Sequence, residues 1–137
     1  MSLAPALSPE ELGALLKQGL EQRAQWMLQD VAANEEAWGL EDANGWVVAK
    51  LALPIPGGPA YALPLWPRQE LAALESAGPG ELPRAIDMES LLEELLPEVA
   101  ERNWGILAFS VKNAGQAFKA EEFSAQLSDA WEAISED

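Results

Sequence analysis

Apolar residues recur at helical spacing in the first quarter of the chain, which is typical of one face of an amphipathic helix. They are Leu12, Leu16, Leu20, Met27 and Val31. The preceding Ser8-Pro9-Glu10-Glu11 offers an N-cap serine, a proline at the first helical position and a glutamate three residues after the cap. The pattern predicts one helix from about Pro9 to Ala33, loosened at Gly19.

Strand patterns follow, separated by turn residues. Ala37–Leu40 is short and apolar, and Asp42-Ala43-Asn44-Gly45 predicts a hairpin turn because Asn-Gly favours left-handed backbone. The β-branched and aromatic run Trp46–Leu51 is the best strand in the chain. The loop Pro54–Pro59 ends this strand, and Ala60–Leu65 is expected to pair back as a third strand. The proline within that third strand places its end at an edge or outside the sheet.

The second half mixes helices with strands through short turns. Asp87 is the expected N-cap of a leucine-rich helix that Pro97 should kink or divide. The other expected elements are a helix at 67–77 closed by Gly78-Pro79-Gly80, strands at 105–111 and 116–119 around a turn at 112–115, and a last helix at 121–135. No linker separates two cores, so we predict one α+β domain over residues 1–137, with residues 1–8 flexible. Its sheet is expected to be small and mostly antiparallel, with about four to five strands packed against N-terminal, central and C-terminal helices.

The 137-residue chain contains no cysteine and no histidine. These absences exclude disulfides, thiolate chemistry and the commonest general base and metal ligand. Nucleotide-binding and hydrolase motifs (the P-loop, the Rossmann glycine pattern and Gly-x-Ser-x-Gly) are absent too. We therefore predict no catalytic residue, no metal and no cofactor.

The formal net charge is −15. Residues 69–137 hold fifteen acidic and four basic residues, against eight and four in residues 1–68. Repulsion from phosphate argues against partners among nucleic acids and anionic membranes. The charge serves solubility or attracts a basic protein partner. The N-terminus lacks a signal-peptide pattern and the longest uncharged stretch, Leu51–Pro67, is rich in proline, so a cytoplasmic location is expected.

The order of these features resembles the bacterial family called domain of unknown function 2750. The motifs that carry the resemblance span about residues 20–131. They are Glu36-Ala37-Trp38-Gly39-Leu40, Asp42-Ala43-Asn44-Gly45-Trp46, Pro64-Leu65-Trp66-Pro67, the leucine-rich helix from Ile86 to Pro97, the strand Ile106–Val111 and the last helix from Phe123 to Trp131. The resemblance implies an α+β fold and a bacterial, cytoplasmic protein, and it implies no activity.

Two groups of residues are candidates for binding. Trp38, Trp46 and Trp66 lie in a hairpin and at a strand-to-helix junction, where they either fill the core or form an aromatic groove with Arg68. Glu94, Glu98 and Glu101 are expected on one face of the third helix, as either a solvated surface or an acidic docking face. These carboxylates could also ligate a hard cation, but the histidines of a carboxylate-bridged di-iron site are missing.

Three functions remain open at this stage. The first is a non-enzymatic interaction protein, for example an inhibitor or immunity-like partner of a basic protein, which uses the tryptophan-rich surface or the acidic helix face. The second is a small-molecule binding module with an aromatic pocket. The third is an enzyme that depends on a carboxyl with a raised pKa. The oligomeric state is not predicted.

Overall fold

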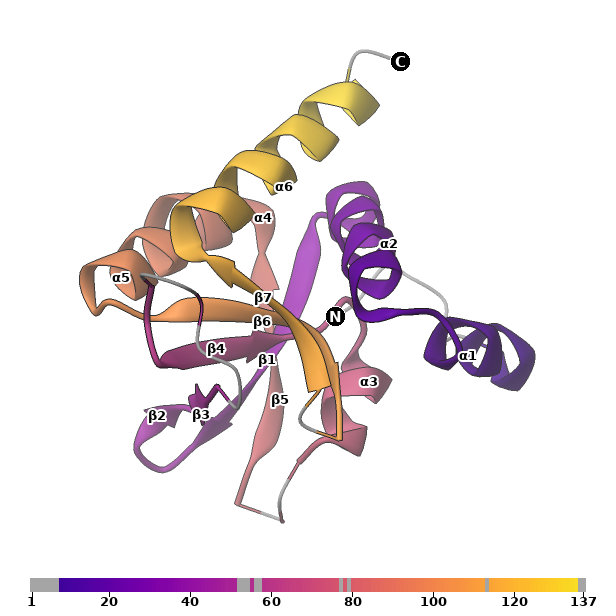
Figure 1. Ribbon diagram of the computed structural model, residues 1–137, viewed down its shortest axis with the longest axis horizontal. Coiled ribbons are helices and arrows are strands. Elements are labelled where there is room, and N and C mark those ends of the chain that lie inside the picture. The colour runs from indigo at the N-terminus through magenta and orange to yellow at the C-terminus, as the bar shows by residue number, and fades with distance from the viewer. Residues whose placement is uncertain are drawn as a thin grey trace.

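In the computed structural model, the strands of the described residues form two sheets surrounded by helices (Figure 1). The structure describes residues 8–51, 55, 58–76, 78, 80–112 and 114–135. In chain order the elements are α1 (Pro9–Leu16), α2 (Leu20–Asn34), β1 (Glu36–Asp42), β2 (Gly45–Trp46), β3 (Ala49–Lys50), β4 (Tyr61–Leu65), α3 (Gln69–Leu74), β5 (Leu82–Asp87), α4 (Met88–Ser90), the π-helical turn η1 (Leu91–Leu95), α5 (Leu96–Glu101), β6 (Gly105–Val111), β7 (Ala114–Lys119) and α6 (Ala120–Ser135). The predicted α+β class in a single domain is confirmed.

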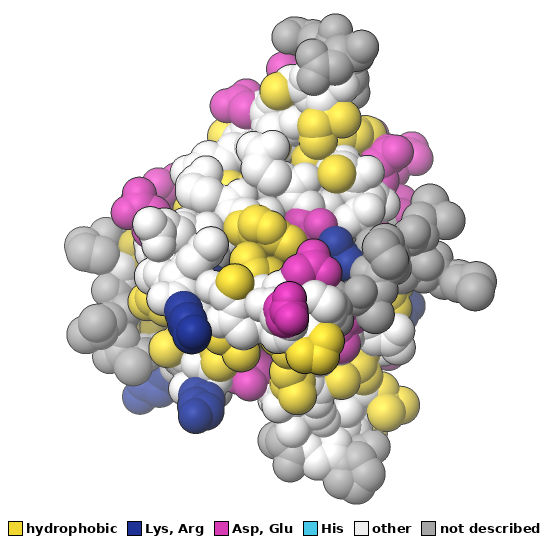
Figure 2. Space-filling model, turned by 90° about the vertical axis from the view of Figure 1, so that its right-hand side faces the viewer, with side chains coloured by type: hydrophobic (Ala, Val, Ile, Leu, Met, Phe, Trp, Pro, Cys, Tyr) yellow, Lys and Arg dark blue, Asp and Glu magenta, His cyan; other side chains and the backbone are white. Residues whose placement is uncertain are grey.

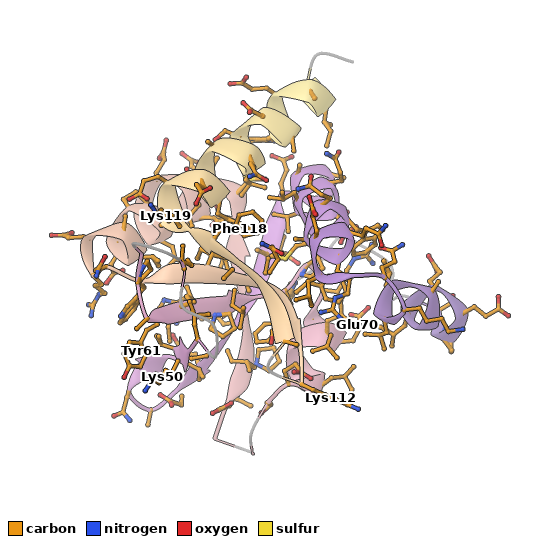
Figure 3. All side chains as sticks on the ribbon, in the orientation of Figure 1. Lys50, Tyr61, Glu70, Lys112, Phe118 and Lys119 are labelled. Atoms are coloured by element: carbon orange, nitrogen blue, oxygen red, sulfur yellow. The ribbon has the colours of Figure 1, made fainter. Side chains whose placement is uncertain are left out.

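The two sheets have the orders β2-β1-β5 and β3-β4-β6-β7. All neighbouring strands are antiparallel except β4 and β6, which run parallel. Trp38 of β1 and Trp66, just after β4, exchange two backbone hydrogen bonds of 2.8 Å and so join the sheets. At the edge of the larger sheet, Lys50 and Tyr61 are cross-strand partners and lie side by side in Figure 3.

The hydrophobic core lies between the sheets and the helices. Helix α2 packs against α6, β6 and β7, and α5 packs against α6, while the last turns of α6 extend beyond the sheets (Figure 1). The largest fully buried side chains include Phe109 and Phe123. Because strand β6 is buried along nearly its whole length, it forms the centre of this core.

The expected helix from Pro9 to Ala33 is two helices. The break falls at Gly19, whose extended backbone (φ −68°, ψ 166°) begins α2 and whose N–H donates to Oε1 of Gln22 at 3.2 Å. Ser8 caps α1 with the predicted capping box, in which Glu11 N–H donates to the serine hydroxyl oxygen and the Glu11 carboxylate accepts from Ser8 N–H. The helical pattern is confirmed on both sides of the break, but α1 ends at Leu16 and Gly19 is the N-cap of a new helix.

The expected strand Trp46–Leu51 is divided between the two sheets. Trp46 pairs with β1, whereas Ala49 and Lys50 pair with β4. The hairpin turn before it is confirmed, because Asp42 and Gly45 are cross-strand partners. Gly45 has a positive φ (112°), whereas Asn44 does not. The chain passes from the smaller sheet to the larger one within this run, although the run has β-branched and aromatic residues on both sides of that point. Residue composition alone therefore does not reveal the change of sheet.

Strand β5 was not anticipated. It contains Pro83 and is mostly exposed, so it lacks the apolar run that marks a buried strand. The predicted N-cap at its end is confirmed, since Asp87 accepts a hydrogen bond from Ser90 N–H at 3.2 Å. Two predictions fall largely on residues that the structure does not describe: the loop at 54–59 and the flexible segment at 1–8. Pro79 also lies outside the described residues.

Near Pro97 the third helix changes its hydrogen-bonding pattern, although it stays continuous from Met88 to Glu101. The proline lies in the first turn of α5, and the preceding η1 is a π-helical turn in which Leu96 N–H donates to Leu91 C=O. Since proline has no N–H, the normal hydrogen-bond ladder cannot pass through this position. Short π-helical segments are often found at functional sites, and this one forms part of the groove described next.

Candidate functional site

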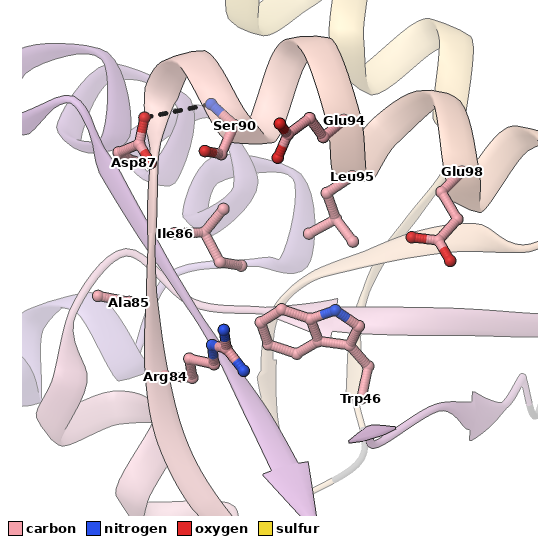
Figure 4. A pocket seen from close by; sticks show the side chains of 9 residues that line it. All are labelled: Trp46, Arg84, Ala85, Ile86, Asp87, Ser90, Glu94, Leu95 and Glu98. Carbon is pink, nitrogen blue, oxygen red and sulfur yellow. Dashed lines mark hydrogen bonds between the residues drawn. The ribbon is translucent and has the colours of Figure 1, made fainter. Parts of the chain in front are cut away.

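A groove lies between the smaller sheet and the helix made of α4, η1 and α5 (Figure 4). Its volume is about 270 Å³. The sheet contributes Trp46 from β2 and residues 84–87 of β5, and the helix contributes Ser90, Glu94, Leu95 and Glu98. Ser90, Glu94 and Glu98 follow one another at intervals of four residues, so they line the same side of the helix. In Figure 4 their side chains face the sheet.

Gly39 allows Trp46 to lie across strand β1. Gly39 and Arg84 are cross-strand partners, and a Cβ atom on Gly39 would lie only 2.8 Å from Cζ3 of Trp46. The indole therefore occupies the space where a side chain of β1 would stand. The Arg84 guanidinium lies 5.6 Å from the centroid of the Trp46 ring, within the range of a cation–π contact.

A second lobe continues the groove on the other side of Trp46. It has a volume of about 300 Å³ and shares Trp46, Leu95 and Glu98 with the first lobe. Its other lining residues include Arg102, whose guanidinium lies 5.2 Å from the centroid of the Trp104 ring. Each lobe thus contains one tryptophan–arginine pair.

The charges of the groove are unevenly paired. Arg84 forms an ion pair with Glu41, and Arg102 forms one with Glu98 at 3.1 Å. Glu94 takes part in no ion pair or hydrogen bond with any residue that the structure describes. The groove therefore holds one carboxylate whose charge is available to a ligand.

The Asp87 carboxylate at the end of the groove is already engaged. The hydroxyl and the backbone N–H of Ser90 both lower its pKa, because hydrogen bonds to the carboxylate favour the charged form. Asp87 is thus fixed as the N-cap of α4, and it leaves Glu94 and Glu98 as the acidic groups along the wall.

Trp38 and Trp66 lie in the core rather than in the groove. Their side chains are only 6% and 2% exposed. The Trp38 indole N–H donates to Oε1 of Glu36 at 2.9 Å, and that of Trp66 donates to the carbonyl oxygen of Ser110 at 2.8 Å. Their hydrogen-bonding capacity is therefore satisfied within the protein.

Trp46 differs from these two tryptophans. It is half-buried, and its indole N–H has no acceptor among the described residues. A buried apolar body with an unpaired polar edge is typical of a tryptophan at a binding surface. Among the three tryptophans named as candidates, Trp46 is the one that lines the groove.

Arg68 is held by α2 and does not reach the groove. Its Nε lies 2.7 Å from Oδ2 of Asp30, and both side chains are 11% exposed. The hydrogen bond with Asp30 raises the pKa of Arg68, against the opposing effect of burial. The guanidinium also lies 5.9 Å from the centroid of the Trp26 ring. These contacts indicate that the guanidinium has a structural role.

Glu101 lines neither lobe of the groove, although Glu94 and Glu98 do. The helical spacing of three and four residues suggested one common face, but Glu101 lies at the end of α5 beyond that face. Other acidic side chains are scattered over the face of the molecule shown in Figure 2 instead of forming one continuous patch. Position in the groove, rather than charge density, separates Glu94 and Glu98 from the remaining acids.

Sequence reasoning missed Arg84, Arg102 and Trp104 as groove residues. Arg84 was missed together with its strand. Leu82, Arg84 and Ile86 are spaced two residues apart, as residues on one face of a strand are. Arg102 stands four residues after Glu98, a spacing that predicts their ion pair. Trp104 follows a helix end and carried no local signal of its own.

The fold defines a small acidic α+β protein with a groove between its smaller sheet and the helix made of α4, η1 and α5. The chain belongs to the family described as "Protein of unknown function (DUF2750)", whose model matches residues 24–127. The resemblance noted in the sequence is thereby confirmed. The chain has no significant match among curated proteins or among solved structures. Within the described residues, no helix has the length and apolar character needed to cross a membrane.

Proposed function

We propose that the chain is a non-enzymatic binding protein whose groove receives a basic segment of a protein partner. The observation that carries this proposal is the unpaired carboxylate of Glu94 in a groove that also contains the exposed edge of Trp46. An arginine or lysine side chain can lay its aliphatic stem against Leu95 and Trp46 while its charged head reaches Glu94. A concrete case is an inhibitor or immunity-like partner of a basic protein in the cytoplasm.

The charge of the chain supports a basic partner. A net charge of −15 attracts cations over a distance set by the ionic strength, and it repels acidic competitors. Catalysis by a carboxyl group at neutral pH would require a raised pKa. The carboxyls with shifted values, Glu11 and Asp87, are both lowered, because each accepts hydrogen bonds as part of a helix cap.

The probe for this proposal is the fluorescein-labelled peptide acetyl-Val-Arg-Val-Arg-Val-Arg-amide, with fluorescence anisotropy as the readout. We expect Glu94→Gln/Glu98→Gln to weaken binding by about tenfold, the effect of losing ~1.4 kcal/mol of charge-assisted contact. The matched control is Glu93→Gln/Glu101→Gln, which changes the same charge on the same helix outside the groove. It should weaken binding by about twofold or less, because exposed charges contribute little.

Two outcomes contradict the proposal. If both double variants weaken binding equally, the peptide responds only to net charge. If the peptide with glutamate in place of arginine binds as well, or if binding does not weaken as salt is raised, the groove does not recognise a basic segment. Capture from a lysate of the native host, with the wild type and the two double variants in parallel, then identifies the natural partner.

A further inference from the structure

Strand β5 is an unpaired edge beside the groove. It lies at the end of the order β2-β1-β5 and pairs with β1 alone among the described strands. Arg84, Ala85 and Asp87 are exposed, and Leu82 is 63% exposed. An accessible sheet edge with an exposed leucine is a template for the addition of another strand.

The register shows which backbone groups of β5 face outward. Met88 N–H donates to Glu35 C=O at 3.0 Å. In an antiparallel ladder every second pair of facing residues is hydrogen-bonded, so Ile86 and Ala37 form the next hydrogen-bonded pair. The residues between them, Pro83, Ala85 and Asp87, direct their backbone groups away from β1. Trp38, the partner of Ala85, agrees with this assignment, since its backbone groups bond to Trp66 on the opposite edge of β1.

The outer edge and the groove are continuous. Residues 84–87 line the groove together with Ser90 and Glu94. Arg84 and Ile86 point into the groove in Figure 4, whereas Ala85 points the other way, as alternation along a strand requires. A strand added outside β5 would follow the same alternation, so every second side chain would enter the groove below Ser90 and Glu94.

We propose that the basic segment of the partner binds in extended form along the outer edge of β5, as a fourth strand of the sheet β2-β1-β5. This proposal rests on the proposed function and adds the mode of recognition to it. Backbone hydrogen bonds to Ala85 supply a contact that does not depend on partner sequence, and Glu94 selects a basic side chain at an alternate position. A second copy of the chain is a poor occupant, because it too carries a charge of −15.

Pro83 limits this edge to a short ladder. Proline has no N–H, so at its outward position it offers only its carbonyl oxygen. The donors that remain are the N–H groups of Ala85 and Asp87. The bound segment is therefore expected to make backbone hydrogen bonds over about three residues, which suits a selective contact and discourages long edge-to-edge aggregation.

The test is N-methylation of the arginine–valine peptide, one amide at a time. A methyl group on an amide that faces β5 removes a hydrogen bond and adds bulk, whereas one on an amide that faces outward does neither. We expect losses of tenfold or more at alternate amides and twofold or less at the amides between them. Equal effects at neighbouring amides overturn strand addition while leaving the proposed function intact. Failure of the unmethylated peptide to bind removes the proposed function itself.

A protein variant tests the other side of the ladder. Ala85→Pro removes one outward N–H without deleting a hydrogen bond to β1, and it should weaken peptide binding about tenfold. Ala85→Ser at the same position is the control and should bind like the wild type. Urea unfolding of both variants shows whether the fold is retained. If Ala85→Pro unfolds the protein, the alternation of the N-methyl series decides the question alone.

Discussion

Gly39 should have a specific coupling to Trp46 that can be measured as a free energy. A Cβ atom at position 39 would lie 2.8 Å from Cζ3 and 3.1 Å from Cε3 of Trp46, and 3.6 Å from Leu65. Overpacking of this kind lowers the free energy of unfolding by about 1–3 kcal/mol. Replacing glycine with alanine also restricts the unfolded chain, which raises it by about 0.4–1 kcal/mol. The net expectation for Gly39→Ala is a loss of about 1–2 kcal/mol.

The sign should reverse when the indole is removed. In a Trp46→Ala background the contact is gone, so Gly39→Ala should leave the free energy of unfolding unchanged or raise it by up to about 1 kcal/mol. The coupling between the two sites is then about 1–3 kcal/mol. Urea unfolding of the four proteins, followed by far-UV circular dichroism, measures it directly. Gly13→Ala is the control, since nothing lies within 4 Å of a Cβ there.

The result that refutes this reasoning is an equal loss in both backgrounds. Such a result would mean that the added Cβ disturbs the backbone of β1 or meets Leu65 rather than Trp46. If the coupling is found, Gly39→Ala should also weaken binding of the arginine–valine peptide, because the displaced indole no longer lines the groove. The stability measurement stands independently of the proposed function, so the two can fail separately.

Two further predictions concern stability. Asp30→Ala should lower the free energy of unfolding by about 3 kcal/mol, because it removes the carboxylate that Arg68 contacts at 2.7 Å in a site that is only 11% exposed. Urea unfolding measures this, and an exposed pair would give less than 1 kcal/mol. The pKa values of the Glu11 and Asp87 carboxyls are lowered in the folded protein, so the unfolded chain binds more protons in acid. These two groups therefore stabilise the fold above the ordinary carboxyl pKa. This stabilisation is lost as the pH falls through their lowered folded-state pKa values. Glu11→Gln/Asp87→Asn should therefore flatten the dependence of the unfolding free energy on pH between about pH 5 and pH 2, and an unchanged slope would show that other groups carry it.

Much of the fold could be predicted because local signals and tertiary structure agree. The capping box at Ser8, the Asn-Gly turn before Trp46 and the proline in the third helix each act through backbone chemistry within a few residues. The last helix was predicted within one residue of its bounds. Such features depend on hydrogen bonds and steric limits that the neighbouring sequence already contains.

The sheets could not be predicted to the same degree, because pairing between distant segments decides them. The run from Trp46 to Leu51 has uniform strand composition, yet its two ends belong to different sheets. Conversely, β5 has a weak strand pattern and forms because β1 supplies a partner along its whole length. Strand propensity mostly reflects packing against neighbours, which the sequence of one strand does not contain.

The candidate site was predicted in part for the same reason. Trp46, Glu94 and Glu98 were named from residue type and spacing, and the structure brings them to one groove. Arg84 came from a strand that was not anticipated. Arg68 was named because it follows Trp66, but its charge is paired with Asp30, which lies 38 residues earlier in the chain. Partners at this distance decide whether a charged side chain is available for binding.

The state of each indole N–H provides the physical distinction between core and binding tryptophans. A buried N–H without an acceptor lowers stability by about 1–3 kcal/mol, so tryptophans that belong to the core acquire acceptors within the protein. Trp38 and Trp66 have such acceptors, and Trp46 has none among the described residues. Its N–H lies at a groove whose edge strand also offers unpaired backbone groups, and Glu94 adds an unpaired charge. These three groups are accessible to water in the free protein, so a partner that docked in the groove would replace bound water with direct hydrogen bonds and an ion pair.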